Sequence, residues 1–197
     1  MIAYIDGKLT FKDPTYVIID IGGLGYHIKI SLQTYAVLKE GERCRLHTFL
    51  HIKEDAHTLY GFAENAEKRL FLDLISVSGI GPNTAVMMLS SLSYAEIQNA
   101  IVSEDLRTIQ SIKGIGSKTA QRVILELKDK IKKGIFAGEM PNIAVSANNS
   151  LRNEALSALI TLGIPKNVAE KSIDTIMKTE GTTLSLEQLI KKALKPS

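Results

Sequence analysis

One phrase occurs twice in this chain, and it constrains the fold more than any other feature. Residues 79–85 read GIGPNTA and residues 114–120 read GIGSKTA, at an offset of 35 residues. Each copy lies between segments whose apolar residues recur at helical spacing. The repeat therefore predicts two copies of one supersecondary unit, each made of a helix, a tight Gly-x-Gly turn and a second helix.

The two glycines of each turn have different expected roles. The first, Gly79 or Gly114, can take the positive φ with which a chain leaves a helix. The second, Gly81 or Gly116, lets a flat ligand approach the backbone, and the isoleucine between them can anchor the turn in the core. The helix that follows begins with free N–H groups, which suit a phosphate.

The phrase resembles the helix-hairpin-helix motif, which binds the DNA backbone without reading the sequence. A single such turn also fits an ordinary helix end followed by a new helix, but two copies at this spacing are a fairly specific signal. A basic residue is common in this motif where Asn83 lies, so the first copy is expected to bind phosphate more through backbone amides than through charge. The resemblance implies these DNA-backbone-binding residues: Gly79, Ile80, Gly81, Asn83, Thr84, Gly114, Ile115, Gly116, Lys118, Thr119 and Arg122.

Other phosphate-binding loops fit the repeat less well. A Walker A loop has four residues between its glycines, whereas one residue separates Gly114 from Gly116. The dinucleotide-binding fingerprint needs a third glycine and a preceding strand. A lone Cys44 and four scattered histidines indicate no metal cluster. We therefore expect no nucleotide-hydrolysing site, no catalytic residues, no metal and no other cofactor.

The charge of the chain favours nucleic-acid binding only through its distribution. The formal net charge is +3, but residues 106–133 hold eight basic side chains against two acidic ones. Such a run is usually a solvated helix face, and it gains meaning beside two phosphate-type turns. The lone cysteine fits a reducing compartment, the start of the chain indicates no signal peptide, and no apolar run reaches about 18 residues. A cytoplasmic protein with no membrane span is expected.

Residues 1–64 are predicted to form a small β-barrel. Runs such as 17–21 and 26–30 are β-branched or alternate in polarity, and turn residues separate them. About five short strands fit this length, which favours a closed OB-type barrel, with a small SH3-like barrel as the alternative. The polar residues 53–56 are expected to form a hairpin tip.

The rest of the chain is predicted to be helical, which gives an α+β multidomain protein. Residues 65–133 form the tandem helix-hairpin-helix domain. Residues 134–150 contain Pro141 and no sustained period, so they are predicted to be a flexible linker. Residues 151–197 are predicted to be a three-helix domain. At 47 residues it is marginal in size, which favours a tethered partner-binding module over a catalyst.

Two short signals set the bounds of the helices in this last domain. Gly163 is expected to end the first helix, and Ser185 with Gln188 resembles a capping box at the start of the last one. The first helix has more apolar positions than one buried stripe needs. A docking surface for a partner protein is therefore predicted at Leu156, Leu159, Ile160 and Leu162. The alternative is that these residues belong to the core, and for Leu159 the two readings are about equal.

The order of these parts resembles the RuvA family, bacterial proteins that bind Holliday junctions. The start MIAYIDGKL, the segment KEDAHTLYGF and the two repeats carry the resemblance, which is close over residues 1–133 and looser beyond. It implies a homotetramer, sometimes an octamer on DNA, that holds a four-way junction open and recruits the hexameric ATPase RuvB for branch migration. The resolvase RuvC is a further candidate partner. It also implies that Glu54 and Asp55 form an acidic pin, although on their own they fit a solvated hairpin tip.

Two alternative functions fit the sequence less well. A helix-hairpin-helix glycosylase would need an acid about twenty residues after the hairpin beside a base pocket, whereas Asp129 lies 13 residues after Gly116. No carboxylate cluster indicates a two-metal nuclease. A generic single-strand-binding OB protein would need a basic groove with stacking aromatics. Stacking aromatics are sparse here, and residues 1–64 are slightly acidic.

Overall fold

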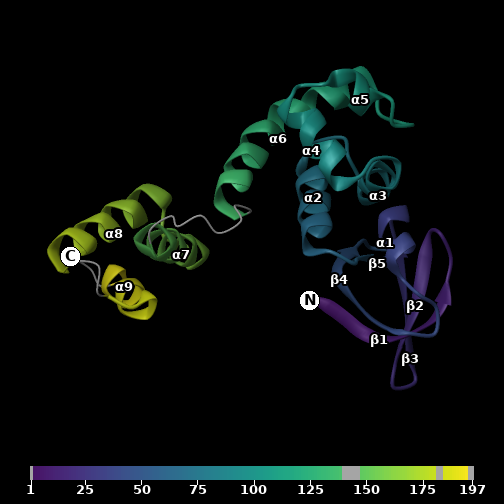
Figure 1. Ribbon diagram of the computed structural model, residues 1–197, viewed down its shortest axis with the longest axis horizontal. Helices are drawn as coiled ribbons and strands as arrows, with labels where there is room; N and C mark the ends of the chain where they lie inside the picture. Colours follow the sequence, from purple (N-terminus) through teal and green to yellow (C-terminus); the bar gives the residue numbers. More distant parts are fainter. Residues whose placement is uncertain (1, 139–146, 181–183, 195–197) are drawn as a thin grey trace. The chain divides into compact units, whose positions relative to one another are not determined.

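The chain divides into two compact units, Met1–Glu139 and Met140–Ser197. The computed structural model in Figure 1 describes residues 2–138, 147–180 and 184–194.

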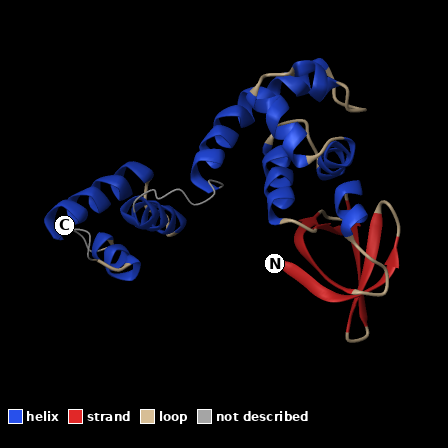
Figure 2. Ribbon diagram, in the orientation of Figure 1, coloured by secondary structure: helices blue, strands red, loops and turns tan. Residues whose placement is uncertain are grey.

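The first unit begins with five strands that close into a barrel, drawn in red in Figure 2. The strands are β1 (Tyr4–Lys12), β2 (Tyr16–Ile21), β3 (Leu24–Ile30), β4 (Arg43–Ile52) and β5 (His57–Phe62). They are ordered β1–β2–β3–β5–β4, with β4 paired back to β1 and with β3 parallel to β5. A helix, α1 (Leu32–Val37), connects β3 to β4. This is the arrangement of an OB-type barrel, which confirms that prediction over the SH3-like alternative.

The barrel is built on the alternation of its strands. In β3, Ile28 and Ile30 are buried, whereas His27 is exposed and Lys29 is half-buried. The inward residues of the five strands make one core, so each outward residue has a fixed direction. Buried members of this core are Ile5, Leu9, Val17, Ile19, Ile28, Ile30, Leu38, Leu46 and Leu59.

Five helices complete the first unit, and the first of them packs on the barrel. They are α2 (Asn65–Ser76), α3 (Pro82–Ser91), α4 (Tyr94–Val102), α5 (Leu106–Gln110) and α6 (Ser117–Gly138). Phe71 of α2 is fully buried, and its ring centroid lies 4.8 Å from that of Phe62 and 5.4 Å from that of Tyr60. One apolar cluster runs from these β5 rings through α2 to the later helices, so barrel and helices form one body.

A buried carboxylate ties α1 to α2. Glu67 is 6% exposed and accepts hydrogen bonds from the hydroxyls of Ser31 and of Thr34, the latter at 2.7 Å. The Thr34 hydroxyl in turn accepts from the backbone N–H of Ala63 at 3.0 Å. Burial raises the pKa of the Glu67 carboxyl above its usual value, and the two hydroxyl donors oppose that shift.

The predicted linker 134–150 is too long at both ends. The helix α6 continues to Gly138, and α7 (Ala147–Thr161) begins before residue 150. No proline precedes Pro141 in this stretch, and a glycine inside a helix costs only about 1 kcal/mol, so α6 continues past Gly134. Residues 139–146 lie outside the described part of the chain.

The second unit is a three-helix domain formed by α7, α8 (Lys166–Glu180) and α9 (Leu186–Ala193). As predicted, Gly163 ends α7 with a φ of 91°, and the next N–H, that of Ile164, donates back to Leu159 O at 3.0 Å. The capping box of Ser185 and Gln188 is also confirmed. The fully buried core is small: Ala155, Leu159, Ala169, Ile173 and Leu189.

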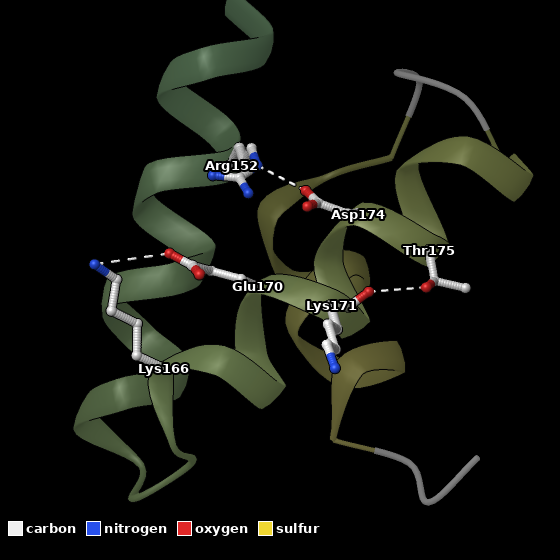
Figure 3. A network of polar contacts seen from close by, with 6 residues as sticks. All are labelled: Arg152, Lys166, Glu170, Lys171, Asp174 and Thr175. Carbon is white, nitrogen blue, oxygen red and sulfur yellow. Dashed lines mark hydrogen bonds and ion pairs between the residues drawn. The ribbon is translucent and has the colours of Figure 1, made fainter.

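An ion pair at the side of this small core joins the first two helices of the domain. The Arg152 guanidinium of α7 donates to the Asp174 carboxylate of α8 at 2.8 Å, as Figure 3 shows. The Asp174 carboxylate raises the pKa of Arg152. Figure 3 also shows Lys166 beside Glu170, at 3.7 Å within α8.

Candidate nucleic-acid interface

The two Gly-x-Gly turns have the same backbone conformation. The φ of Gly79 is 97° and that of Gly114 is 86°, which confirms the positive φ predicted for both. The isoleucine that follows is 5% exposed in the first turn and 6% in the second, and in each its N–H donates three residues back at 3.1 Å. Ile80 and Ile115 therefore anchor both turns in the apolar core of the first unit.

The second glycine of each turn is not required by the fold. Gly81 has a φ of −87°, which any residue adopts, and it caps the start of α3. A Cβ placed at Gly81 or Gly116 would meet nothing within 4 Å, and both residues are exposed. A side chain here would instead stand in the open space in front of the N-terminus of α3 or α6. These glycines keep the backbone N–H groups of both helix starts accessible.

Each motif contacts the turn of the other motif. Nη1 of Arg122 in α6 donates to the backbone carbonyl of Ser78, beside the first turn, at 3.5 Å. Met87, the residue 35 positions earlier, has its Cε methyl 3.3 Å from where a Cβ of Gly114 would lie. The two copies of the repeat thus contact each other reciprocally, with a residue of each motif beside the turn of the other.

The predicted cations differ in their surroundings. Lys118 and Arg122 are exposed near the start of α6, and Thr84 and Thr119 are half-buried. Farther along α6, two lysines of the basic run are engaged within the protein: Lys128 pairs with Glu104, and Lys130 donates to Ser76 Oγ at 3.3 Å. Lys118 and Arg122 are therefore the members of the predicted set whose charge lies at the start of α6.

The first turn has a basic neighbour that the sequence did not reveal. Asn83 is exposed, and its Oδ1 accepts from Lys29 Nζ at 3.3 Å and from the Tyr60 hydroxyl at 2.9 Å. Lys29 comes from β3, 54 residues earlier in the chain. Its outward position followed from strand alternation, but nothing in the spacing indicated that it would meet a helix start.

The acidic tip predicted between β4 and β5 is present. Glu54 and Asp55 are exposed in a hairpin closed by the N–H of Lys53, which donates to Ala56 O at 2.9 Å. Beside the tip, Ile52 at the end of β4 is 62% exposed. The end of β4 lies beyond the barrel core, where the alternation no longer corresponds to burial.

The docking set predicted in the last domain, Leu156, Leu159, Ile160 and Leu162, is corrected at one residue. Leu159 is fully buried in the three-helix core and cannot contact a partner. Leu156 packs partly against that core, whereas Ile160 is 43% exposed and Leu162 is 61% exposed. Leu162 lines a shallow groove of 540 Å³ between α7 and α9, together with Ala158, Leu186 and Ile190. Ile160 does not line that groove.

The described residues form neither a metal site nor a membrane-spanning helix. No group of three or more His, Cys, Asp or Glu side chains in this part of the chain could hold a metal ion. No helix there has the length and apolar character needed to cross a membrane. Asp129, the acid nearest to a glycosylase position, is exposed on α6.

Comparison with known proteins places three family models along the chain. Residues 1–61 match the RuvA N-terminal domain, residues 71–129 match a SAM-like helix-hairpin-helix tandem, and residues 150–196 match the RuvA C-terminal domain. The middle match covers both Gly-x-Gly turns.

Curated relatives align with the whole chain. A protein of Cytophaga hutchinsonii is 60% identical and covers 100% of both sequences. One from Amoebophilus asiaticus is 49% identical over 99% of this chain and 100% of its own length. One from Bacteroides fragilis is 46% identical over 99% of each. All three are named "Holliday junction branch migration complex subunit RuvA".

Proposed function

This chain belongs to the RuvA family, and from that membership we propose that it binds four-way DNA junctions as a subunit of a branch-migration complex. The observation that carries the proposal is the reciprocal pairing of the two turns. Arg122 and Met87 each lie beside the turn of the other motif, and each turn has an accessible glycine and a helix start.

The paired turns bind the DNA backbone rather than the bases. Backbone N–H groups at the starts of α3 and α6 donate hydrogen bonds to phosphate oxygens, and Lys118 and Arg122 add positive charge. Phosphate contacts fix the position and register of a duplex without reading its sequence. A junction that migrates through any sequence requires this mode of binding.

Four copies around one axis match the four arms of a junction, so we propose a homotetramer, or an octamer formed by two tetramers on DNA. Glu54 and Asp55, on their exposed hairpin, would then lie near the centre as the family's acidic pin. Their charges repel the phosphates at the crossover and help the strands to separate.

The protein itself is not an enzyme in this proposal and has no ATPase site. The energy for migration comes from the hexameric motor RuvB, which docks on the three-helix domain. The groove lined by Leu162, Leu186 and Ile190 is the proposed contact, with Leu156 and Ile160 beside it. The resolvase RuvC is a further partner, and the complex acts in the cytoplasm.

The direct test of this function is a gel-shift comparison of a four-way junction with a linear duplex of the same sequences, with mass measured on the complex. We expect preference for the junction and a mass of four or eight chains per junction. Equal affinity for duplex and junction would contradict the proposal.

A further inference from the structure

The two repeats differ in the charge that they present beside their turns. The offset of 35 residues pairs Lys118, the second residue of α6, with Asn83, the second residue of α3. The second turn therefore has a cation of its own, whereas the first has a neutral amide. Taken alone, two such turns would hold their phosphates unequally.

A cation from the barrel lies where the first repeat lacks one. Nζ of Lys29, on the outer side of β3, donates to Oδ1 of Asn83 at 3.3 Å. The hydroxyl of Tyr60 donates to the same oxygen at 2.9 Å, and Tyr60 is only 3% exposed. Burial raises the pKa of Tyr60, so its phenol remains a neutral donor at physiological pH.

These two contacts fix the orientation of the Asn83 amide. An ammonium group has only donor hydrogens, so the carbonyl oxygen of the amide must face Lys29. The –NH2 group, with two donor hydrogens, then lies on the opposite side of an exposed residue at the start of α3. The amide thus holds the cation beside the turn and contributes donors of its own.

The charge of Lys29 is not neutralised by its neighbours. Within the described residues no carboxylate pairs with Lys29, in contrast to Lys128, which is paired with Glu104. A groove of 550 Å³ opens beside it between barrel and α3, lined by Lys29, Tyr60 and Asn83 among others, and no acidic side chain lines it. An anion that approaches the first turn therefore meets an uncompensated positive charge.

We propose that Lys29 supplies the phosphate-binding cation that the first helix-hairpin-helix copy lacks, so that barrel and helices form one composite backbone-binding site. Lys29 lies outside residues 71–129, which match the tandem model, so the motif alone does not identify it. The inference rests on the proposed function, because DNA phosphate is taken as the ligand. Each subunit then presents a cation at both turns, Lys29 at the first and Lys118 at the second.

The test is the slope of log affinity against log salt concentration for a four-way junction, in which each neutralised phosphate contributes about −0.9. Lys29→Ala should make the slope shallower by about 0.9 for each bound subunit. Adding Asn83→Lys to Lys29→Ala should restore it, since the cation returns at the position equivalent to Lys118. Lys39→Ala removes an exposed lysine between α1 and β4, which lies 3.8 Å from Glu42, and it should leave the slope unchanged.

The possible results separate this inference from the function on which it rests. If Lys29→Ala keeps the wild-type slope while Lys118→Ala has a shallower slope, Lys29 does not bind a phosphate but the turns still bind DNA. If the unmodified protein fails to prefer the junction, the proposed function itself is wrong. Should Lys29→Ala lower the melting temperature, the folded double variant decides: a restored slope supports the inference, and a slope that stays shallow overturns it.

Discussion

The guanidinium of Arg122 donates to the backbone carbonyl of Ser78 at 3.5 Å, so a residue of the second motif contacts the turn of the first. The reciprocal contact, of Met87 with Gly114, is apolar. Ile80 and Ile115 also lie in one apolar cluster, so both turns are anchored in the same core. Two binding points at a fixed separation match a repeating phosphate backbone better than two independent loops would.

Substitutions at the four turn glycines should separate effects on stability from effects on junction binding. Gly79→Ala and Gly114→Ala force a side chain into positive φ and should each cost about 1–3 kcal/mol of unfolding free energy. Gly81→Ala and Gly116→Ala place a methyl group in open space, so the melting temperature should not change. They should nevertheless weaken junction binding, because the loss of one hydrogen bond to a charged group costs about 1.5–3 kcal/mol. Thermal unfolding and gel shifts on the four variants check both halves. Normal binding by the Gly81→Ala, Gly116→Ala double variant would exclude close backbone contact.

Reversing the charge of the hairpin tip should change selectivity rather than abolish binding. In the variant Glu54→Lys with Asp55→Lys, repulsion of crossover phosphates becomes attraction. We expect junction affinity to be kept or increased, the preference over linear duplex to decrease, and branch migration to change. The control is Glu40→Lys with Glu42→Lys, an equal charge change at exposed positions between α1 and β4. If both double variants give the same selectivity, the tip is only a solvated turn.

Buried Glu67 should make stability depend on pH. Its carboxyl has a pKa raised by burial above the ordinary 4.5, so the unfolded chain loses this proton first as pH rises. Stability is fully retained below the ordinary pKa and decreases as pH rises through the raised one, by up to about 1.4 kcal/mol per pH unit. Glu67→Gln can still hydrogen-bond Ser31 and Thr34, and it should lack this decrease.

Denaturant unfolding of both proteins between pH 4.5 and 8 measures the effect of Glu67. The stability of Glu67→Gln relative to wild type should rise with pH across this range. A constant difference would mean that the carboxyl titrates normally in the folded protein. Glu67→Ala should be less stable at every pH, because it leaves two buried hydroxyls without their partner.

Substitutions in the three-helix domain should distinguish core residues from residues of the docking groove. Leu162→Glu places a charge in the exposed groove, so it should leave the domain folded and impair stimulation of the motor ATPase. Leu159→Ala removes a core side chain and should destabilise the domain by about 2–5 kcal/mol. Val168→Glu, at a residue of α8 that is 48% exposed, is the matched control. Normal ATPase stimulation and branch migration by Leu162→Glu would move the motor contact elsewhere.

Removing the whole three-helix domain also tests whether that domain is needed for motor docking but not for junction binding. Because α6 extends to Gly138, the shortened chain should end there rather than at Lys133, where the cut would fall inside the helix. We expect residues 1–138 to assemble and bind junctions but not to support motor-driven migration. Migration at the full rate would rule out a docking role for residues 151–197.

Local sequence patterns predicted the local structure well. The glycine turns follow from a repeat of adjacent residues, and the barrel follows from strand alternation. Contacts between distant segments were not accessible in this way. Lys29 meets Asn83 only because α2 and α3 pack on the barrel side of the unit. Glu67 is buried only because α2 lies against the hydroxyls of Ser31 and Thr34. Likewise, the helical spacing of apolar residues identified the apolar side of α7. It did not show which part of that side α9 leaves exposed.

The central claim is that the paired turns bind the DNA backbone without reading its sequence. The most direct measurement is the affinity of wild type and Lys118→Ala for two four-way junctions of unrelated sequence across a salt series. We predict that wild type binds both junctions with equal affinity and that Lys118→Ala loses the same affinity on both. The salt slope of the variant should be shallower by about 0.9 per bound subunit, the contribution of one phosphate contact. A loss confined to one junction sequence, or an unchanged salt slope, would contradict the claim.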